Sequence, residues 1–72
     1  MGNRISSERA FFGMSQTDLS RELGVSRETI SAWENGKEIP VSALKKMAQE
    51  IFRCSADWLI GISEIRSTRK NT

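Results

Sequence analysis

A short turn in the first half of the chain constrains its fold more than any other feature. Gly24-Val25-Ser26 separates two short segments whose apolar residues recur at helical spacing. Glycine accepts the positive φ that turns a chain sharply after a helix, and a serine side chain accepts a hydrogen bond from a free N–H at the start of the next helix. Val25 is placed to fill the gap between the two helices. The sequence therefore predicts two short helices joined by a tight turn, the arrangement called helix-turn-helix.

Helical spacing continues along the rest of the chain, and no stretch alternates clearly enough to predict a strand. We expect a first helix over residues 3–12, with Ile5, Arg9 and Phe12 on one face. The apolar stripe of a fourth helix consists of Leu44, Met47, Ala48 and Ile51. Residues that favour helix ends separate the segments: Gly13, Ser15, Asp18, Gly24, Ser26, Asn35, Gly36, Ser55 and Gly61. The prediction is an all-α fold of five helices, in which the second and third flank the turn.

Length and composition exclude several kinds of protein. The 72 residues leave room for one small domain, and the single cysteine, Cys54, excludes an intrachain disulfide. Histidine is absent, which excludes His-based catalytic triads and His-ligated zinc. No apolar run approaches the ~18 residues of a membrane span. We therefore expect a non-enzymatic protein of the cytoplasm, without a cofactor, a metal, a small-molecule ligand or a membrane anchor.

The basic residues are unevenly distributed. The chain has 11 lysines and arginines against 9 acidic residues, a net charge of +2 and a pI of about 9.1. Without Arg66, Arg69 and Lys70 the remainder holds 8 basic and 9 acidic residues. A polyanion would therefore have to bind to one focused positive face rather than to the whole surface. We place the domain at residues 1–63 and a basic, flexible tail at residues 64–72.

The segment after the turn has two contrasting sides. Ile30 and Trp33 form its apolar edge, and Trp33 is expected to anchor it to the core. The opposite side is polar or small and consists of Arg27, Glu28, Ser31 and Ala32. Such a strip can enter the DNA major groove, which is about 12 Å wide. The turn alone is equally compatible with an ordinary helical hairpin in a small bundle.

Longer stretches of the sequence resemble a known family. The runs SQTDLSRELGVS at 15–26 and TISAWENGK at 29–37 are similar to the lambdoid phage repressor and Cro proteins, which belong to the XRE-type helix-turn-helix family. Pro40 and the run SADWLI at 55–60 extend this similarity, so that it covers roughly residues 4–61. The resemblance implies a five-helix DNA-binding domain, similar to that of lambda repressor, that docks on double-stranded operator DNA as a two-fold dimer.

The resemblance also implies roles for individual residues. Those matched to base-contacting positions are Arg27, Glu28, Ser31 and Ala32, and those matched to phosphate contacts are Gln16, Thr29, Asn35 and Lys37. Arg9 and Glu34 match a structural ion pair. Relatives often carry glutamine where Arg27, Glu28 and Ala32 stand, so the operator does not follow from the family.

Several of these residues have an alternative interpretation. Arg27 suits the O6 and N7 atoms of guanine but equally a phosphate, and Glu28 suits the N4 of cytosine but equally the helix dipole. Trp33 and Trp58 are interpreted as core anchors rather than as platforms for bases. The expected dimer surface consists of Trp58, Ile60, Ile62 and Ile65. The resemblance implies it in part, and in part it is expected because the three isoleucines would otherwise be exposed apolar groups near a terminus.

The predicted function is a sequence-specific transcriptional regulator, a repressor that blocks a promoter by occupying it. Two alternatives stay open at this point. One is the DNA-binding antitoxin of a toxin–antitoxin pair, although the segment 64–72 is short for neutralising a toxin. The other is a protein-interaction module without a DNA role.

Overall fold

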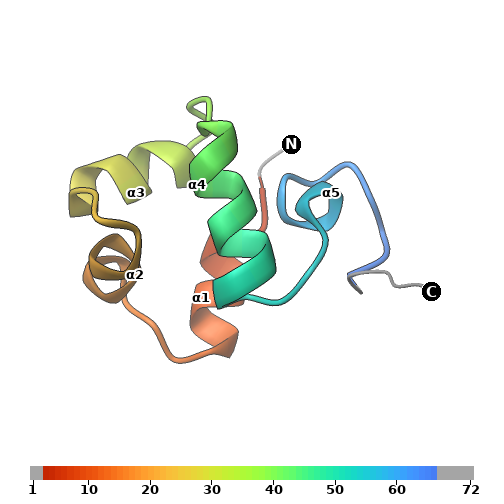
Figure 1. Ribbon diagram of the computed structural model, residues 1–72, viewed down its shortest axis with the longest axis horizontal. Helices are drawn as coiled ribbons and strands as arrows, with labels where there is room; N and C mark the ends of the chain where they lie inside the picture. The colour runs from red at the N-terminus through yellow and green to blue at the C-terminus, as the bar shows by residue number, and fades with distance from the viewer. Residues whose placement is uncertain (1–2, 67–72) are drawn as a thin grey trace.

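The computed structural model describes residues 3–66, and these form helices and no strand. The elements in chain order are α1 (Ile5–Phe11), α2 (Gln16–Leu23), α3 (Arg27–Glu34), α4 (Val41–Lys46), the π-helix η1 (Met47–Ile51) and α5 (Ala56–Leu59). Figure 1 shows α2 and α3 at one end of the molecule, α5 at the other, and the α4–η1 rod between them. The predicted all-α fold with five helices is confirmed, since η1 continues α4 without a break.

The helix ends follow the predicted capping residues. Ser15 and Asp18 form a capping box, in which the Ser15 hydroxyl accepts from the Asp18 N–H and the Asp18 carboxylate accepts from the Ser15 N–H. Hydrogen bonding with the Ser15 backbone N–H, and to a smaller extent with the Ser15 side chain, holds the pKa of Asp18 below its ordinary value. Ser26 and Ser55 cap α3 and α5 in the same way, each accepting from the N–H three residues later. Local sequence thus fixes where these three helices begin.

Helix α1 is shorter than the sequence predicts. It begins at Ile5, where the Asn3 side-chain oxygen accepts a hydrogen bond from the Ile5 N–H, and it ends at Phe11. Phe12 therefore lies beyond the helix, and its side chain is 44% exposed rather than on a buried face. Its ring stacks on Phe52 with the centroids 5.9 Å apart. The prediction failed at Phe12 because helical spacing does not apply past the last turn.

The fourth helix changes its winding where it enters the core. Its π-turn is closed by the Phe52 N–H, which donates to the Met47 carbonyl over 2.7 Å, five residues back. Met47 and Ala48 are fully buried, as the predicted stripe requires, but Leu44 and Ile51 are only half-buried. Because a π-turn holds one residue more than an α-turn, Phe52 occupies the buried place that 3.6-residue spacing assigns to Ile51.

The core gathers residues from every helix except α4. Its buried apolar members are Ile5, Leu19, Ile30, Trp33, Met47, Ala48, Phe52, Cys54 and Leu59. At the N-terminal end of the domain, the Arg4 N–H donates to the Leu59 carbonyl over 2.8 Å, which joins the start of α1 to the end of α5. The first and last helices of the domain are therefore joined by a backbone hydrogen bond.

Candidate nucleic-acid interface

The turn between α2 and α3 has the predicted geometry. Gly24 is the C-cap of α2 at φ 70° and ψ 32°, in the left-handed region that favours glycine. The Val25 N–H donates to the Ser20 carbonyl over 3.0 Å, and Val25 packs against the core. Ser20 is itself buried, and its hydroxyl donates to the Thr17 carbonyl over 2.7 Å. These local contacts hold α2 and α3 as one unit, which Figure 1 shows at the end of the molecule away from α5.

Helix α3 divides into an inner and an outer face. Ile30 is fully buried and Trp33 is 5% exposed, so the apolar edge points into the core. The side chains of Arg27 and Glu28 are 53% and 78% exposed and lie 3.5 Å apart as an ion pair. Ser31, together with its neighbour on the chain, Ala32, is half-buried. The start of α3 therefore offers a charged, water-facing strip, while the rest of the helix is fixed by its tryptophan.

A chain of polar side chains connects α1 to the start of α3. Arg9 grips Glu34 with two guanidinium nitrogens, Nε at 2.7 Å from Oε2 and Nη2 at 3.3 Å from Oε1. The Gln16 Nε2 atom donates to Glu34 Oε1 over 3.0 Å, and the Gln16 Oε1 atom accepts from Arg27 Nη1 over 3.3 Å. The ion pair that the family resemblance implied is thus present, and Gln16 extends it to Arg27. Because Arg9 and Glu34 are mostly buried, the network fixes the position of the one exposed arginine at the tip of α3.

The other end of α3 leads into a loop with its own fixed geometry. The Asn35 side-chain Nδ2 donates to the Ser31 carbonyl over 2.8 Å and closes the last turn of the helix. Gly36 follows at φ 101°, and the Lys37 N–H donates back to the Ala32 carbonyl over 3.0 Å. The structure thus uses the Asn35 amide to cap the helix and leaves Lys37 exposed on the loop.

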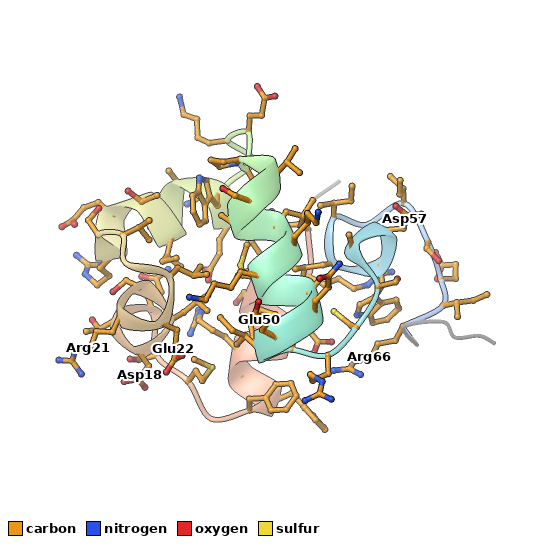
Figure 2. The ribbon with its side chains drawn as sticks, in the orientation of Figure 1. Asp18, Arg21, Glu22, Glu50, Asp57 and Arg66 are labelled. Atoms are coloured by element: carbon orange, nitrogen blue, oxygen red, sulfur yellow. The ribbon has the colours of Figure 1, made fainter. Side chains whose placement is uncertain are left out.

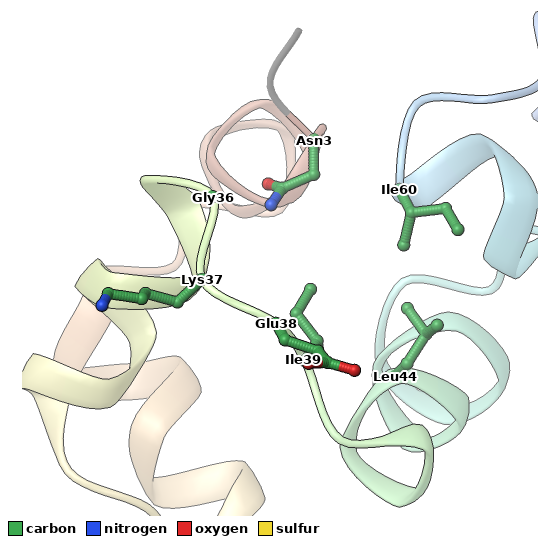
Figure 3. Close-up of a pocket in the computed structure, with 7 residues that line it drawn as sticks. All are labelled: Asn3, Gly36, Lys37, Glu38, Ile39, Leu44 and Ile60. Carbon is green, nitrogen blue, oxygen red and sulfur yellow. The ribbon is translucent and has the colours of Figure 1, made fainter.

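An open hollow lies beside this loop. Its volume is about 310 Å³, and Figure 3 shows how its floor and rim are arranged. The residues that line it are Asn3, Gly36, Lys37, Glu38, Ile39, Leu44 and Ile60. The aliphatic side chains of Ile39, Leu44 and Ile60 converge on one another, whereas Lys37 points away. The Asn3 amide is already engaged, because its Nδ2 donates to the Trp33 carbonyl over 2.7 Å.

The predicted dimer residues differ in exposure. Ile62 and Ile65 are 72% and 68% exposed, and Ile60 is half-buried beside the hollow. Trp58 is half-buried as well, with its ring covered by the Arg4 guanidinium at 3.7 Å from the centroid. The Trp58 indole N–H donates to Glu8 over 3.0 Å. Trp58 is therefore engaged within its own chain, and the isoleucines are the apolar groups that this edge exposes.

Sequence reasoning missed a buried ionic cluster at the same edge. Glu8 is 5% exposed and receives two hydrogen bonds from Arg66, Nε to Oε2 at 3.0 Å and Nη2 to Oε1 at 2.8 Å. The hydrogen bonds from Arg66 lower the pKa of Glu8, which burial would otherwise raise. The sequence predicts that Arg66 belongs to the basic tail, but its guanidinium is bound to Glu8. Figure 2 shows the position of Arg66 below α5. Residues 67–72 of that tail lie outside the described residues.

Neither a metal-ligand cluster nor a membrane-spanning helix occurs among the described residues. Residues 3–66 contain no group of three acidic, cysteine or histidine side chains arranged to hold a metal ion. Across the same residues, no helix has the length and apolarity needed to cross a membrane.

Comparison with known proteins agrees with this geometry. The helix-turn-helix family model matches residues 7–59, which include α2, the turn and α3. The chain therefore belongs to the helix-turn-helix family of XRE type. Proteins that are similar to this chain are named HTH-type transcriptional regulators.

Several curated proteins are similar over much of this region. The HTH-type transcriptional regulator MJ0272 of Methanocaldococcus jannaschii is 48% identical over 40 residues, 56% of this chain and 61% of that protein. A regulator of Archaeoglobus fulgidus is 37% identical over 57 residues, 79% of this chain and 80% of that protein. The regulator YgzD of Bacillus subtilis is 42% identical over 40 residues, 56% of this chain and 61% of that protein. The matched part thus spans about three fifths of two of these relatives.

Proposed function

We propose that this chain is a sequence-specific regulator that binds double-stranded DNA and represses transcription by occupying a promoter. The observation that carries the proposal is the division of α3, with Trp33 held inside and Arg27 and Glu28 left in water. A helix of this kind, preceded by the Gly24 turn, enters a major groove with its N-terminal residues against the base edges. Family membership supports the same activity.

The base contacts come from the outer face of α3. The fork of Arg27 matches the O6 and N7 acceptors of guanine, the commonest specific contact. Glu28 accepts from the N4 of cytosine, and the Ala32 methyl group meets the methyl group of thymine. Ser31 lies between them on the same side of the helix and donates to a base edge. Arg27 is free to do this only when it leaves Gln16 and Glu28, its partners in the DNA-free protein.

The phosphate contacts flank these bases. Gln16 stands at the first position of α2, where the helix N-terminus favours a phosphate. Thr29 contributes its hydroxyl, which in the free protein shares a hydrogen bond with Ser26 over 2.9 Å. Asn35 and Lys37 grip the backbone from the loop after α3, Asn35 through the amide hydrogen that Ser31 does not use. Such contacts fix the register of α3 without reading sequence.

The small size of the domain bears on how many half-sites the operator contains. A single module of this kind buries only about 600–1,000 Å² of protein surface on DNA, which limits the affinity of one copy. We propose that two copies bind a palindromic operator whose half-sites lie about 34 Å apart, one helical turn of DNA. The self-association surface is the α5 edge with Trp58, Ile60, Ile62 and Ile65, of which Ile62 and Ile65 are the most exposed.

Selection from random DNA tests the proposal. Purified protein is incubated with duplexes that carry a random region of about 30 base pairs, wide enough for two half-sites, and the retained duplexes are sequenced. The binding of the selected site is then measured for the wild type, Arg27→Ala and Lys37→Ala, with Arg21→Ala as a control. Arg21 is an exposed arginine on the outer side of α2, as Figure 2 shows.

Two different responses are expected. Arg27→Ala costs about 1–3 kcal/mol on the selected site and relaxes the preference at one base pair. Lys37→Ala weakens binding to all sequences alike and lowers the slope of log affinity against log salt by about one. Arg21→Ala leaves affinity and preference unchanged. If Arg27→Ala binds the selected site with unchanged affinity and salt dependence, the groove model is wrong.

A further inference from the structure

The described residues that follow α5 are held against the domain at several points. We call residues 61–66 the strap. Its last two residues are held by Ser55, the N-cap of α5: the Ser55 N–H donates to the Arg66 carbonyl over 3.0 Å, and the Ser55 hydroxyl donates to the Ile65 carbonyl over 3.3 Å. In its middle, Arg4 Nη1 donates to the Ser63 carbonyl over 3.1 Å. The strap thus has a defined course, although only Ile62 and Ile65 supply it with apolar side chains.

One ion pair holds the end of the strap to the core. The fork of Arg66 binds both carboxylate oxygens of Glu8, and its Nη2 also donates to the Phe52 carbonyl over 2.8 Å. The Glu8 side chain is 7% exposed and that of Arg66 is 38% exposed, so the pair is partly shielded from water. The second partner of Glu8 is the indole N–H of Trp58. Glu8 therefore joins α1, α5 and the strap, and its contact with the strap is made through the side chain of Arg66.

The strap turns its two isoleucines outward. Ile62 is 72% exposed and Ile65 is 68% exposed, while the polar groups of the strap make the internal contacts. This is the reverse of what burial favours for a segment that packs on its own domain. Two apolar side chains held in water by a fixed backbone form a surface that is prepared for a partner.

The same edge also carries a receptor for an apolar side chain. The hollow of about 310 Å³ is lined by Ile60, which directly precedes the strap, and its floor is formed with Ile39 and Leu44. An apolar cavity of about 150 Å³ already accommodates benzene, which has more carbon atoms than an isoleucine side chain. An edge with both protruding and receiving apolar groups is self-complementary, as an interface with two-fold symmetry requires.

The size of this edge favours a second copy of the chain over an unrelated protein. A stable interface buries about 800 Å² on each partner, and the described chain exposes 4542 Å² in all. Two isoleucines and one hollow fall well short of such a share of the surface. A small contact is effective when both partners are already held on neighbouring DNA half-sites, because their effective concentration is then high.

We propose that Arg66, clamped on Glu8, is a positioning residue for a self-association face formed by Ile62 and Ile65, whose partner is a second copy bound to the adjacent half-site. The inference rests on the proposed DNA binding and deepens it. The face makes binding to two half-sites cooperative, while the free protein associates only weakly. Arg66 acts indirectly, since it fixes the strap and the isoleucines make the contact.

The contact itself is tested with surface variants. Binding is measured on a selected duplex with two half-sites and on the same duplex with one half-site scrambled, for the wild type and for Ile62→Ser/Ile65→Ser. Phe11→Ser is the matched control, because Phe11 is a large apolar side chain that is 77% exposed on α1. We expect the double variant to lose roughly a hundredfold in cooperativity, since each isoleucine is lost from both copies, and to bind the single half-site like the wild type. Phe11→Ser retains full cooperativity.

The role of Arg66 is tested separately with Arg66→Ala and Arg66→Lys. Hydrogen exchange at the Ser55 amide reports whether the strap is closed, because that amide donates to the Arg66 carbonyl. Arg66→Ala is expected to speed this exchange and to reduce cooperativity to the level of the double isoleucine variant, with single half-site binding unchanged. Arg66→Lys, which keeps the charge but loses the fork, falls between the two. Circular dichroism identifies a variant that has unfolded, and Arg66→Lys then carries the test.

The outcomes separate the two proposals. If the wild type binds no duplex, the proposed function fails. The self-association face is then tested by itself, by comparing the isoleucine variant with Phe11→Ser in sedimentation equilibrium of the free protein at high concentration. If single half-sites are bound but the isoleucine variant stays as cooperative as the wild type, the self-association face is wrong. If Arg66→Ala opens the strap and cooperativity persists, Arg66 has no positioning role.

Discussion

The ion pair between Arg9 and Glu34 permits a sharp prediction, because it is closely enclosed and connects three helices. The side chains are 17% and 10% exposed, and two N–H groups of Arg9 bind the two carboxylate oxygens. Arg9 also donates to the Met14 carbonyl over 3.0 Å, and Gln16 donates to Glu34. Replacing Glu34 by alanine leaves the Arg9 guanidinium with a single carbonyl partner inside the protein.

The expected loss of stability is large for so small a domain. Breaking a buried ion pair by removing one partner costs about 3–5 kcal/mol. The remaining exposure of both side chains places Glu34→Ala near the lower limit, at about 3 kcal/mol. A domain of this length has a total free energy of unfolding of about 4–11 kcal/mol. The midpoint of thermal unfolding should then fall by about 12–24 °C.

A double variant distinguishes the charge effect from a loss of packing. In Arg9→Met/Glu34→Leu both charged groups are replaced by apolar side chains of similar length, so that no buried charge is left without a partner. Such replacements are often neutral, and we expect stability within about 1 kcal/mol of the wild type. Thermal and urea unfolding followed by circular dichroism measure the wild type, Glu34→Ala, the double variant and the two single variants Arg9→Met and Glu34→Leu that complete its cycle.

Two results would refute this reasoning. If Glu34→Ala loses less than about 1 kcal/mol, the pair is solvated in solution and contributes no more than a surface pair. If the double variant loses as much as the two single variants together, the cost lies in packing rather than in an unpaired charge. DNA binding by the double variant adds information, because Gln16 loses its acceptor there and no longer holds Arg27 in place.

Three further perturbations follow from the structure. Gly24→Ala introduces backbone strain at φ 70° without a steric clash, and it should lower the free energy of unfolding in urea by about 1–2 kcal/mol. Gly24→Asn should lower it less, because asparagine tolerates this conformation better than alanine. Equal losses in the two variants would contradict the strain argument. The pKa of Glu8 lies below its ordinary value of 4.5, so the folded state binds fewer protons than the unfolded state. The stability that Glu8 contributes is therefore fully present above pH 4.5 and is lost as the pH falls through the pKa of the folded state. Stability measured against pH should therefore fall less steeply at acid pH in Glu8→Gln than in the wild type, and parallel curves would exclude this origin. Burial raises the pKa of the Cys54 thiol, with the Glu8 charge adding to it, so labelling by a thiol reagent should be slow in the native protein and fast in urea; rapid native labelling would show that Cys54 is not buried.

The sequence was most informative where structure is decided by neighbouring residues. Serines 15, 26 and 55 begin helices because their side chains accept hydrogen bonds from N–H groups three residues away. Gly24 makes the turn because it alone takes the left-handed conformation without strain. The inward side of α3 followed from the spacing of Ile30 and Trp33. Caps, turns and amphipathic faces are local, so the two halves of the helix-turn-helix could be placed before any packing was known.

The site itself was only partly predictable. Arg27 and Glu28 were placed correctly on the outer face of α3, since helical spacing opposes them to Trp33. That Gln16 connects Glu34 to Arg27 follows from the angle at which α2 meets α3, which no residue spacing encodes. The resemblance to the family implied an ion pair of Arg9 with Glu34, and periodicity alone gave no reason to join them.

Only the tertiary structure decided what closes the other end of the domain. Arg66 stands in a basic stretch of the sequence and was therefore expected to belong to a tail, yet it binds Glu8, 58 residues earlier in the chain. The π-turn in η1 brought Phe52 rather than Ile51 into the core, against regular helical spacing. Both outcomes depend on which groups come into contact when the helices pack. A buried carboxylate needs a hydrogen-bond partner and a space in the core needs an apolar side chain, and the tertiary structure decides which residue supplies each. The sequence by itself therefore determined the helices and the turn between α2 and α3, and packing determined the polar contacts and the strap that complete the domain.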